Sequence, residues 1–316
     1  MNVQAARRFE DLLSASPEPT PYDYGMMFKA DGFFARWRSK KRFSLLKGID
    51  VQLRRVLHDG EKVFFLTPGT TVSIGEQFFV GWIAYYLNAR ALVFTTERVL
   101  LLAIDSRKRA GRLVSQIPYT AIASVSSTWT GMCRVKLLNK ETFNFQNVPT
   151  ADRKFLAGFL ADIVKGTNAP FERVQGLEHL CPHCFKVVPG HPDHCPACHG
   201  KFKSPTTAAI RSLIFPGLGD WYLGHRGFAV LEMLGSTFLW LAFVWLPLLA
   251  MALPADPEMA EPELEPLDAS YWITAAIIIG VSHLIDAMMT RHFARKGHHP
   301  DGPARAAAGG PPVLRG

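Results

Sequence analysis

Two long apolar stretches near the C-terminal end constrain the fold of this chain more than any other feature. Residues 228–253 are apolar apart from Glu232, and residues 271–290 form a second such stretch. A helix of about 20 residues crosses the hydrocarbon core of a bilayer. Pro247 can kink a membrane helix without ending it. The sequence therefore predicts transmembrane helix 1 over residues 227–253 and transmembrane helix 2 over residues 271–291.

The charges around these stretches predict an orientation. The connecting loop, residues 254–270, has six acidic residues, four prolines and no lysine or arginine. Basic residues lie at the outer ends of the two stretches: Lys201, Lys203, Arg211, Arg226, Arg291, Arg295 and Lys296. Lysine and arginine favour the cytoplasmic side of a membrane. We expect an integral protein of the bacterial inner membrane with both termini in the cytoplasm and the acidic loop outside.

Four of the five cysteines form two C-x-x-C pairs, Cys181 with Cys184 and Cys195 with Cys198, separated by ten residues. The N-terminus has no apolar segment typical of a signal peptide, so a reducing compartment is expected, where such pairs bind metal rather than form disulfides. Four thiolates complete a tetrahedral zinc shell with no open position. Residues 177–203 therefore predict a structural Zn²⁺ site, and they resemble the short zinc ribbons of bacterial membrane proteins.

Residues 48–166 have the pattern of a small β-rich domain. Two apolar runs flank the turn at residues 95–98, which predicts a hairpin. Further short strands follow, and Thr150 begins a closing helix that ends at Gly166. This pattern favours a small β-barrel or sandwich capped by the helix.

The segments LVFTTERVLLL, IPYTAIASV and FNFQNVPTADRKFLAGFL resemble the bacterial pleckstrin-homology-like domains. The resemblance covers residues 48–166 and implies a seven-stranded bent barrel with a C-terminal helix. It does not imply a particular ligand, because fold does not fix function.

Residues 206–226 contain an apolar run too short to span a membrane, interrupted by Pro216, Gly217 and Gly219. We expect an interfacial or re-entrant Gly-rich turn. Together with HLIDAMMTRH further along, FPGLGDWYLGHRGFAVLEM resembles domains in which such a turn precedes a two-helix membrane hairpin. Here a long acidic loop is inserted in that hairpin.

A polar cluster is expected near the cytoplasmic ends of the two spans. Its members are Asp220, Arg226, Glu232, His283 and Asp286. Ionisable groups at membrane depth are costly and find partners, so we expect Arg226 or His283 to pair with Asp286 or Glu232. The cluster is either a structural lock, which we favour, or a proton-coupled or head-group site.

Two basic stretches are candidate contacts for anionic lipid. The first, in the N-terminal segment 1–47, interleaves aromatic residues with Arg36, Arg38, Lys40, Lys41 and Arg42; the second comprises Arg107, Lys108, Arg109 and Arg112. Such mixtures can lie on an anionic membrane surface, and they also occur on ordinary solvated surfaces. The Gly/Pro-rich tail, residues 297–316, is expected to be disordered.

The sequence contains no G-x-S-x-G, P-loop or H-E-x-x-H motif. The predicted fold is thus multidomain: a small β-barrel, a zinc ribbon and an α-helical transmembrane hairpin. We expect a non-enzymatic membrane-anchored binding or scaffolding protein with a protein partner, anionic lipid as a second candidate ligand, and a hairpin that anchors or forms a homo-oligomer. Two alternatives stay open: an accessory subunit of a transport or envelope-assembly complex, and a membrane-tethered regulator that binds nucleic acid, for which the basic residues near the ribbon are few.

Overall fold

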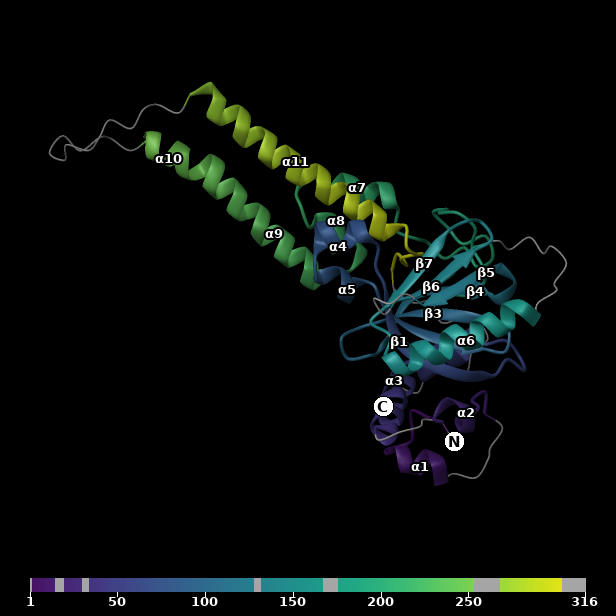
Figure 1. The fold of residues 1–316 in the computed structure, drawn as a ribbon. Helices are drawn as coiled ribbons and strands as arrows, with labels where there is room; N and C mark the ends of the chain where they lie inside the picture. Colours follow the sequence, from purple (N-terminus) through teal and green to yellow (C-terminus); the bar gives the residue numbers. More distant parts are fainter. Residues whose placement is uncertain are drawn as a thin grey trace. The chain divides into compact units, whose positions relative to one another are not determined.

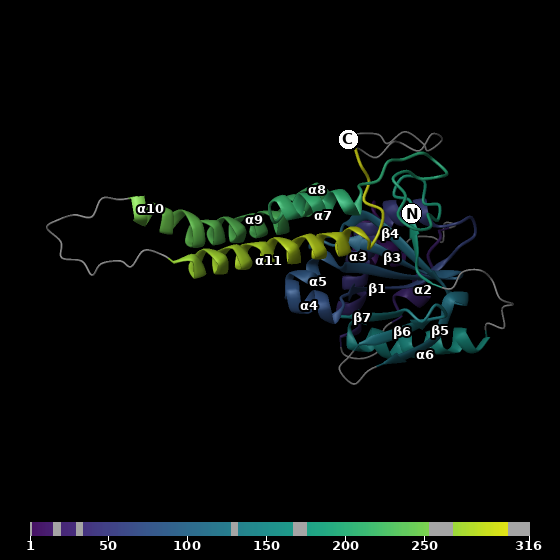
Figure 2. The same ribbon diagram turned by 90° about the horizontal axis from the view of Figure 1, so that it is seen from above.

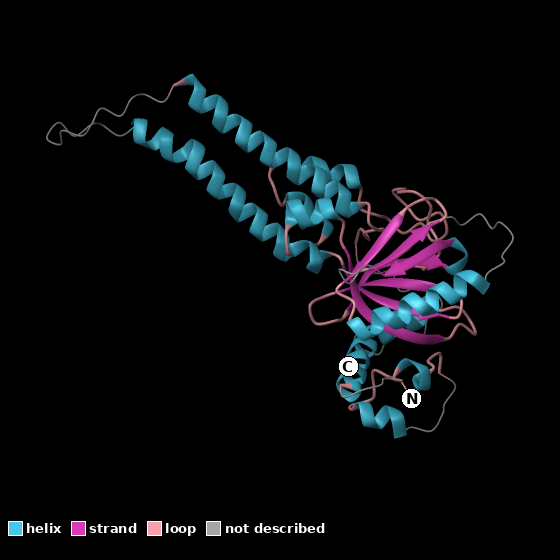
Figure 3. Ribbon diagram, in the orientation of Figure 1, coloured by secondary structure: helices cyan, strands magenta, loops and turns pink. Residues whose placement is uncertain are grey.

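The computed structural model describes residues 2–14, 20–29, 34–127, 132–166, 176–252 and 268–302. The chain divides into two compact units (Figures 1 and 3). The first, here the sheet unit, comprises Met1–Phe202 and Gly297–Gly316, and the second, the hairpin unit, comprises Lys203–Lys296. The boundary predicted at residue 47 falls inside a helix of the sheet unit, and the four cysteines belong to this unit as well.

The sheet unit is built on one antiparallel sheet with the strand order β5-β6-β7-β1-β2-β3-β4-β8. The strands are β1 (Val63–Thr71), β2 (Ala89–Thr95), β3 (Arg98–Ile104), β4 (Ala110–Pro118), β5 (Ile122–Ser127), β6 (Cys133–Leu137), β7 (Thr142–Gln146) and β8 (Glu178–Leu180). The hairpin predicted at residues 95–98 is confirmed, since β2 pairs with β3 on either side of it. The predicted barrel is wrong: β5 and β8 are the two edges of an open sheet.

Helices cover both faces of this sheet. On one face lie α1 (Phe9–Ser14), α2 (Tyr24–Met27) and α3 (Ala35–Val56), and on the other lies α6 (Thr150–Gly166). Two short helices, α4 (Ile74–Val80) and α5 (Ile83–Leu87), form the connection between β1 and β2, and a 3-10 turn η1 (Tyr119–Ala121) precedes β5. On β3, Leu100 and Leu102 belong to the core beneath α1, α2 and α3, while Val99 and Leu101 belong to the core beneath α6. Because both faces are buried, the central strands are continuously apolar in sequence.

A network of buried hydrogen bonds surrounds the turn between β2 and β3. Thr95 Oγ1 accepts the backbone N–H of Arg98 at 3.1 Å and donates to Glu61 Oε1 at 2.6 Å. The Arg98 guanidinium binds both carboxylate oxygens of Glu61, at 3.0 and 2.8 Å. It also donates to the Val56 carbonyl at the end of α3 and to the Gln116 side chain on β4. The T-x-x-R motif therefore joins α3, the hairpin and β4.

The hairpin unit consists of α7 (Pro205–Ile214), α8 (Leu218–Leu223), α9 (Arg226–Trp240), a π-helical segment η2 (Leu241–Trp245), α10 (Leu246–Ala252) and α11 (Ala269–Ala294). Figures 1 and 2 show the α9–α10 arm running antiparallel to α11. The stretches Arg226–Ala252 and Ala269–Ala294 are both long and apolar enough to cross a membrane. The acidic loop predicted over residues 254–270 lies mostly outside the described residues.

The π-helical segment ends two residues before Pro247, which lies in the first turn of α10. Proline has no N–H to donate, and its ring displaces the carbonyl four residues earlier, which is that of Phe243. The Tyr271 hydroxyl of α11 donates to this carbonyl at 3.2 Å. The carbonyl that Pro247 leaves without its helical donor is thus bound by the neighbouring helix.

We predict that Arg98→Met lowers the free energy of unfolding at about pH 7 by about 3–5 kcal/mol, because it leaves Glu61 buried and unpaired. Urea unfolding of the detergent-solubilised full chain measures this. Arg109→Met is the matched control, since Arg109 forms an exposed pair with Asp105 and such pairs contribute little. Equal effects of the two substitutions would contradict the prediction.

The same pair predicts a pH dependence. Burial raises the pKa of Glu61, but hydrogen bonds from Arg98, the His58 N–H and Thr95 outweigh burial and hold it below its ordinary value of 4.5. The pair therefore stabilises the fold at neutral pH, and its contribution is lost as the pH falls below 4.5. The difference in unfolding free energy between wild type and Arg98→Met should shrink on acidification to about pH 4. A constant difference would argue against an ionised Glu61.

Candidate metal centre and polar cluster

Two similar backbone turns position the four cysteines. In each, the residue after the second cysteine donates its N–H to the carbonyl of the first cysteine: Phe185 to Cys181 and His199 to Cys195, both at 2.9 Å. Phe185 and His199 also both have positive φ, 57° and 55°. Each turn thereby aims its pair of Sγ atoms to one side. The first turn directly follows β8, which pairs with β4, so the cysteines are held at the edge of the main sheet.

Two of the sulfur–sulfur distances match those of a tetrahedral thiolate site. The Sγ atoms of Cys181 and Cys198 are 3.7 Å apart, as are those of Cys184 and Cys195. All four lie within 4.8 Å of one another and no disulfide joins them. Four thiolates bound to zinc at about 2.3 Å lie about 3.8 Å apart. The predicted ligand set is therefore confirmed as a cluster able to hold a metal ion.

The electrostatics of the deprotonated cluster favour a bound cation. Burial raises the pKa of the Cys181 and Cys184 thiols. Four deprotonated sulfurs this close repel one another unless a positive charge lies between them. The His183 N–H, 3.4 Å from Cys181 Sγ, supplies part of the compensation. A divalent ion would supply the rest and tie β8 to the loop that follows it.

The start of the C-terminal tail packs beside this site. His298 is buried, stacks on Phe202 with ring centroids 4.7 Å apart, and bonds to the Val188 carbonyl at 3.2 Å. Asp301 pairs with Lys201 at 3.4 Å. Residues 297–302, which were predicted to begin a disordered tail, are therefore ordered in the sheet unit, while the rest of the tail lies outside the described residues.

The hairpin unit contains the predicted polar cluster in part. One carboxylate oxygen each from Asp220, Glu232 and Asp286 lies within 4.8 Å of the other two. Asp220 is buried and is bound by His225 Nδ1 and Thr290 Oγ1, each at 2.7 Å. The backbone N–H of Gly217 donates to Asp286 at 3.1 Å. Glu232 Oε2 is buried with no hydrogen-bond partner among the described residues.

Among the described residues, neither Arg226 nor His283 pairs with these carboxylates. Arg226 lies over the Trp221 ring, 5.9 Å from its centroid. His283 contacts the Leu213 carbonyl at 2.9 Å and Trp240 Nε1 at 3.3 Å. The pair found instead is His225 with Asp220. Sequence reasoning missed it because the left-handed Gly224 turns the chain back between them, so that residues five apart meet.

Glycines allow the elements around the cluster to approach closely. A Cβ on Gly219 would lie 2.3 Å from the Ala208 carbonyl and 2.7 Å from Thr290 Cγ2. Gly217 has φ +89°, and a Cβ there would lie 2.5 Å from the Ala229 carbonyl. The Gly-rich turn therefore lets α8 pack closely against α7, α9 and α11, which brings the three carboxylates together.

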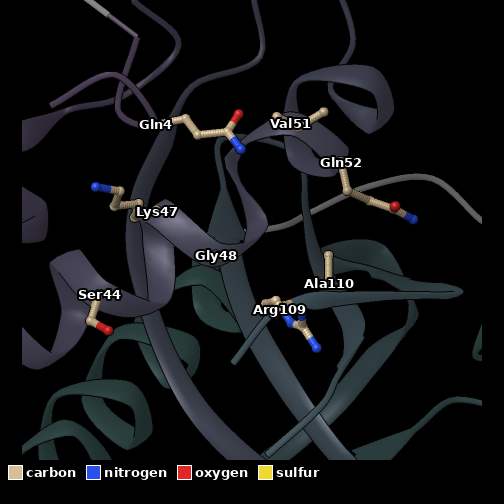
Figure 4. Close-up of a pocket in the computed structure, with 8 residues that line it drawn as sticks. All are labelled: Gln4, Ser44, Lys47, Gly48, Val51, Gln52, Arg109 and Ala110. Atoms are coloured by element: carbon tan, nitrogen blue, oxygen red, sulfur yellow. The ribbon is translucent and has the colours of Figure 1, made fainter. Parts of the chain in front are cut away.

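The two basic stretches meet in the sheet unit. The loop before β4 packs on α3, because Gly48 leaves room there for the Lys108 carbonyl. Burial, and next the neighbouring Lys41, lower the pKa of Lys108. An open pocket of about 440 Å³ lies at this junction, and Figure 4 shows the residues that line it: Gln4, Ser44, Lys47, Gly48, Val51, Gln52, Arg109 and Ala110.

Most of these basic side chains already have partners. Arg42 is buried and paired with Asp152, so its prediction as a lipid contact is wrong. Arg36 and Lys40 bind Glu10, and Lys41 lies over the Trp37 ring at 3.5 Å. Arg109 pairs with Asp105, and Arg112 donates to the Gly302 carbonyl.

Arg38 is half-buried and Arg107 is exposed. Apart from Arg42, lipid contact through these residues stays a prediction.

We predict that Cys184→Ser lowers the bound metal from about one equivalent per chain to well below one, because a serine hydroxyl is a poor replacement for a thiolate. Elemental analysis of the purified full chain measures the metal. Cys133→Ala is the control, since Cys133 is buried away from the cluster, in the core of the sheet unit beneath α6. Retention of one equivalent by Cys184→Ser would argue against the four-thiolate site.

We also predict that Asp220→Ala lowers the melting temperature of the detergent-solubilised chain by several degrees. The substitution leaves His225 and Thr290 without their acceptor, at a cost of about 1–3 kcal/mol. Thr237→Ala is the control, because the Thr237 hydroxyl donates only to the Met233 carbonyl of its own helix, at an exposed position. An unchanged melting temperature for Asp220→Ala would exclude the structural lock.

No protein-family model, no curated protein and no solved structure matches this chain.

Proposed function

We propose that this chain is a non-enzymatic, membrane-anchored binding protein whose sheet unit holds a protein partner at the cytoplasmic surface of the bacterial inner membrane. The observation that supports the membrane anchorage is that the two long helices are largely exposed. Only 6% of the most apolar window of Arg226–Ala252, and 33% of that of Ala269–Ala294, is buried. Apolar helices that bury so little within their own chain are suited to a lipid environment.

The proposed orientation rests on charge. In the sequence, the acidic loop joins the two apolar stretches and the basic residues flank their outer ends, so the positive-inside rule supports both termini in the cytoplasm. A reducing cytoplasm also suits four free thiols. The metal proposed for them is Zn²⁺, in a structural role, because a closed four-thiolate set leaves no position for a reacting water.

The likeness of the sheet unit to bacterial pleckstrin-homology-like domains is part of the proposal. The hairpin with its T-x-x-R turn and the α6 helix after β7 support it, and the open sheet with β8 added at one edge departs from it. Binding through such a unit requires a surface rather than a catalytic residue.

A second candidate function is an accessory subunit of a transport or envelope-assembly complex. The convergence of Asp220, Glu232 and Asp286 favours it, because clustered carboxylates in a membrane segment often mark an ion or proton pathway. Loss of cellular function in Glu232→Gln, at normal protein level and melting temperature, would favour this candidate over the structural lock.

The test of the binding proposal is capture of the tagged full-length chain from cross-linked, detergent-solubilised membranes, read by mass spectrometry. We expect one protein near stoichiometric amount, because a scaffold must hold its partner. A chain that keeps the hairpin unit but lacks residues 1–202 is the control and should lose the partner. Recovery of anionic lipid alone, or of the same proteins by both chains, would contradict the proposal.

A further inference from the structure

The segment between β1 and β2 carries a group of exposed aromatic side chains on two short helices, α4 and α5. Ser73 and Glu76 form a reciprocal capping box at the start of α4. Asn88 then ties the segment together, donating to Glu76 Oε1 at 3.3 Å and to the Ala84 carbonyl at 2.8 Å. The Tyr85 hydroxyl donates to Gln146 on β7 at 3.3 Å. These hydrogen bonds therefore hold the segment in a defined conformation against the sheet.

Three rings of this segment are turned outward. Phe78 is 81% exposed, Trp82 67% and Tyr86 61%, and the rings of Trp82 and Tyr86 contact each other edge to face at 5.5 Å. Since each such ring carries roughly 150–250 Å², together they expose on the order of 400 Å². Exposed apolar patches of this size mark interaction sites.

The surface of the segment carries no charge. Residues 77–89 contain no aspartate, glutamate, lysine or arginine. The charged residues that bracket this stretch, Glu76 and Arg90, are both buried. A protein interface has a polar rim around its apolar centre, whereas tryptophan and tyrosine without charges are typical of the interfacial layer of a bilayer.

We propose that α4 and α5 insert Phe78, Trp82 and Tyr86 into the interfacial layer of the same bilayer that anchors the chain. This inference rests on the proposed membrane anchorage. The anchor keeps the sheet unit at a high effective concentration next to the membrane, so a small aromatic patch suffices to bind. The contact would fix which face of the sheet unit points away from the bilayer and is open to a partner.

The experiment is photo-cross-linking of the full-length chain in nanodiscs of mixed phosphatidylcholine and phosphatidylglycerol. p-Benzoylphenylalanine is introduced singly at position 78, at position 238 in α9, where Phe238 is exposed, and at position 141, where Glu141 is exposed in the β6–β7 turn. Because the probe is an enlarged phenylalanine at an exposed site, each variant should fold, which its melting temperature checks. Adducts are identified by mass spectrometry.

We expect lipid adducts at positions 78 and 238 and none at position 141. Lipid at 238 but not at 78 would overturn the inference and leave the anchorage intact. A protein adduct at 78, whether to a second copy or to the scaffold of the nanodisc, would also overturn it. Absence of lipid at 238 would remove the anchorage and the inference together.

Discussion

The buried pair between Arg98 and Glu61 is the interaction on which the sheet unit depends. A buried charge is tolerated only when it is paired and its remaining donors are used. Here the guanidinium binds both oxygens of Glu61 and also reaches the end of α3 and β4. The position of α3 against the sheet is therefore coupled to the β2–β3 turn, and with it the N-terminal segment becomes part of the core.

The cysteine cluster extends this unit rather than forming a separate one. Since β8 pairs with β4, the two cysteine turns continue the same sheet that Arg98 helps to organise. The first residues after the hairpin unit return to pack beside them through His298 and Asp301. A metal ion held by the four thiols would thus stabilise the edge of the sheet and the return of the chain at once.

The hairpin unit uses polar contacts where the sheet unit uses an apolar core. In a bilayer, the environment proposed for the hairpin unit, helices gain little from burying apolar groups against each other, so close packing and hydrogen bonds hold them together. Gly219 provides the close packing, and Asp220 joins the turn to α11 through Thr290. The same contacts bring Glu232 and Asp286 together. The two interpretations of the cluster, a structural lock and an ion site, therefore involve the same residues.

The sequence by itself determined the features that depend on neighbours along the chain. These are the two apolar helices, the paired cysteine turns, the β2–β3 hairpin and the closing helix α6, because their signals are periodicity, spacing and turn chemistry. Only the tertiary structure decided the open sheet, the burial of Arg42, the Asp220–His225 pair and the aromatic face of α4 and α5. These depend on which distant segments meet, and a residue type alone does not say whether its side chain finds a partner or remains at the surface.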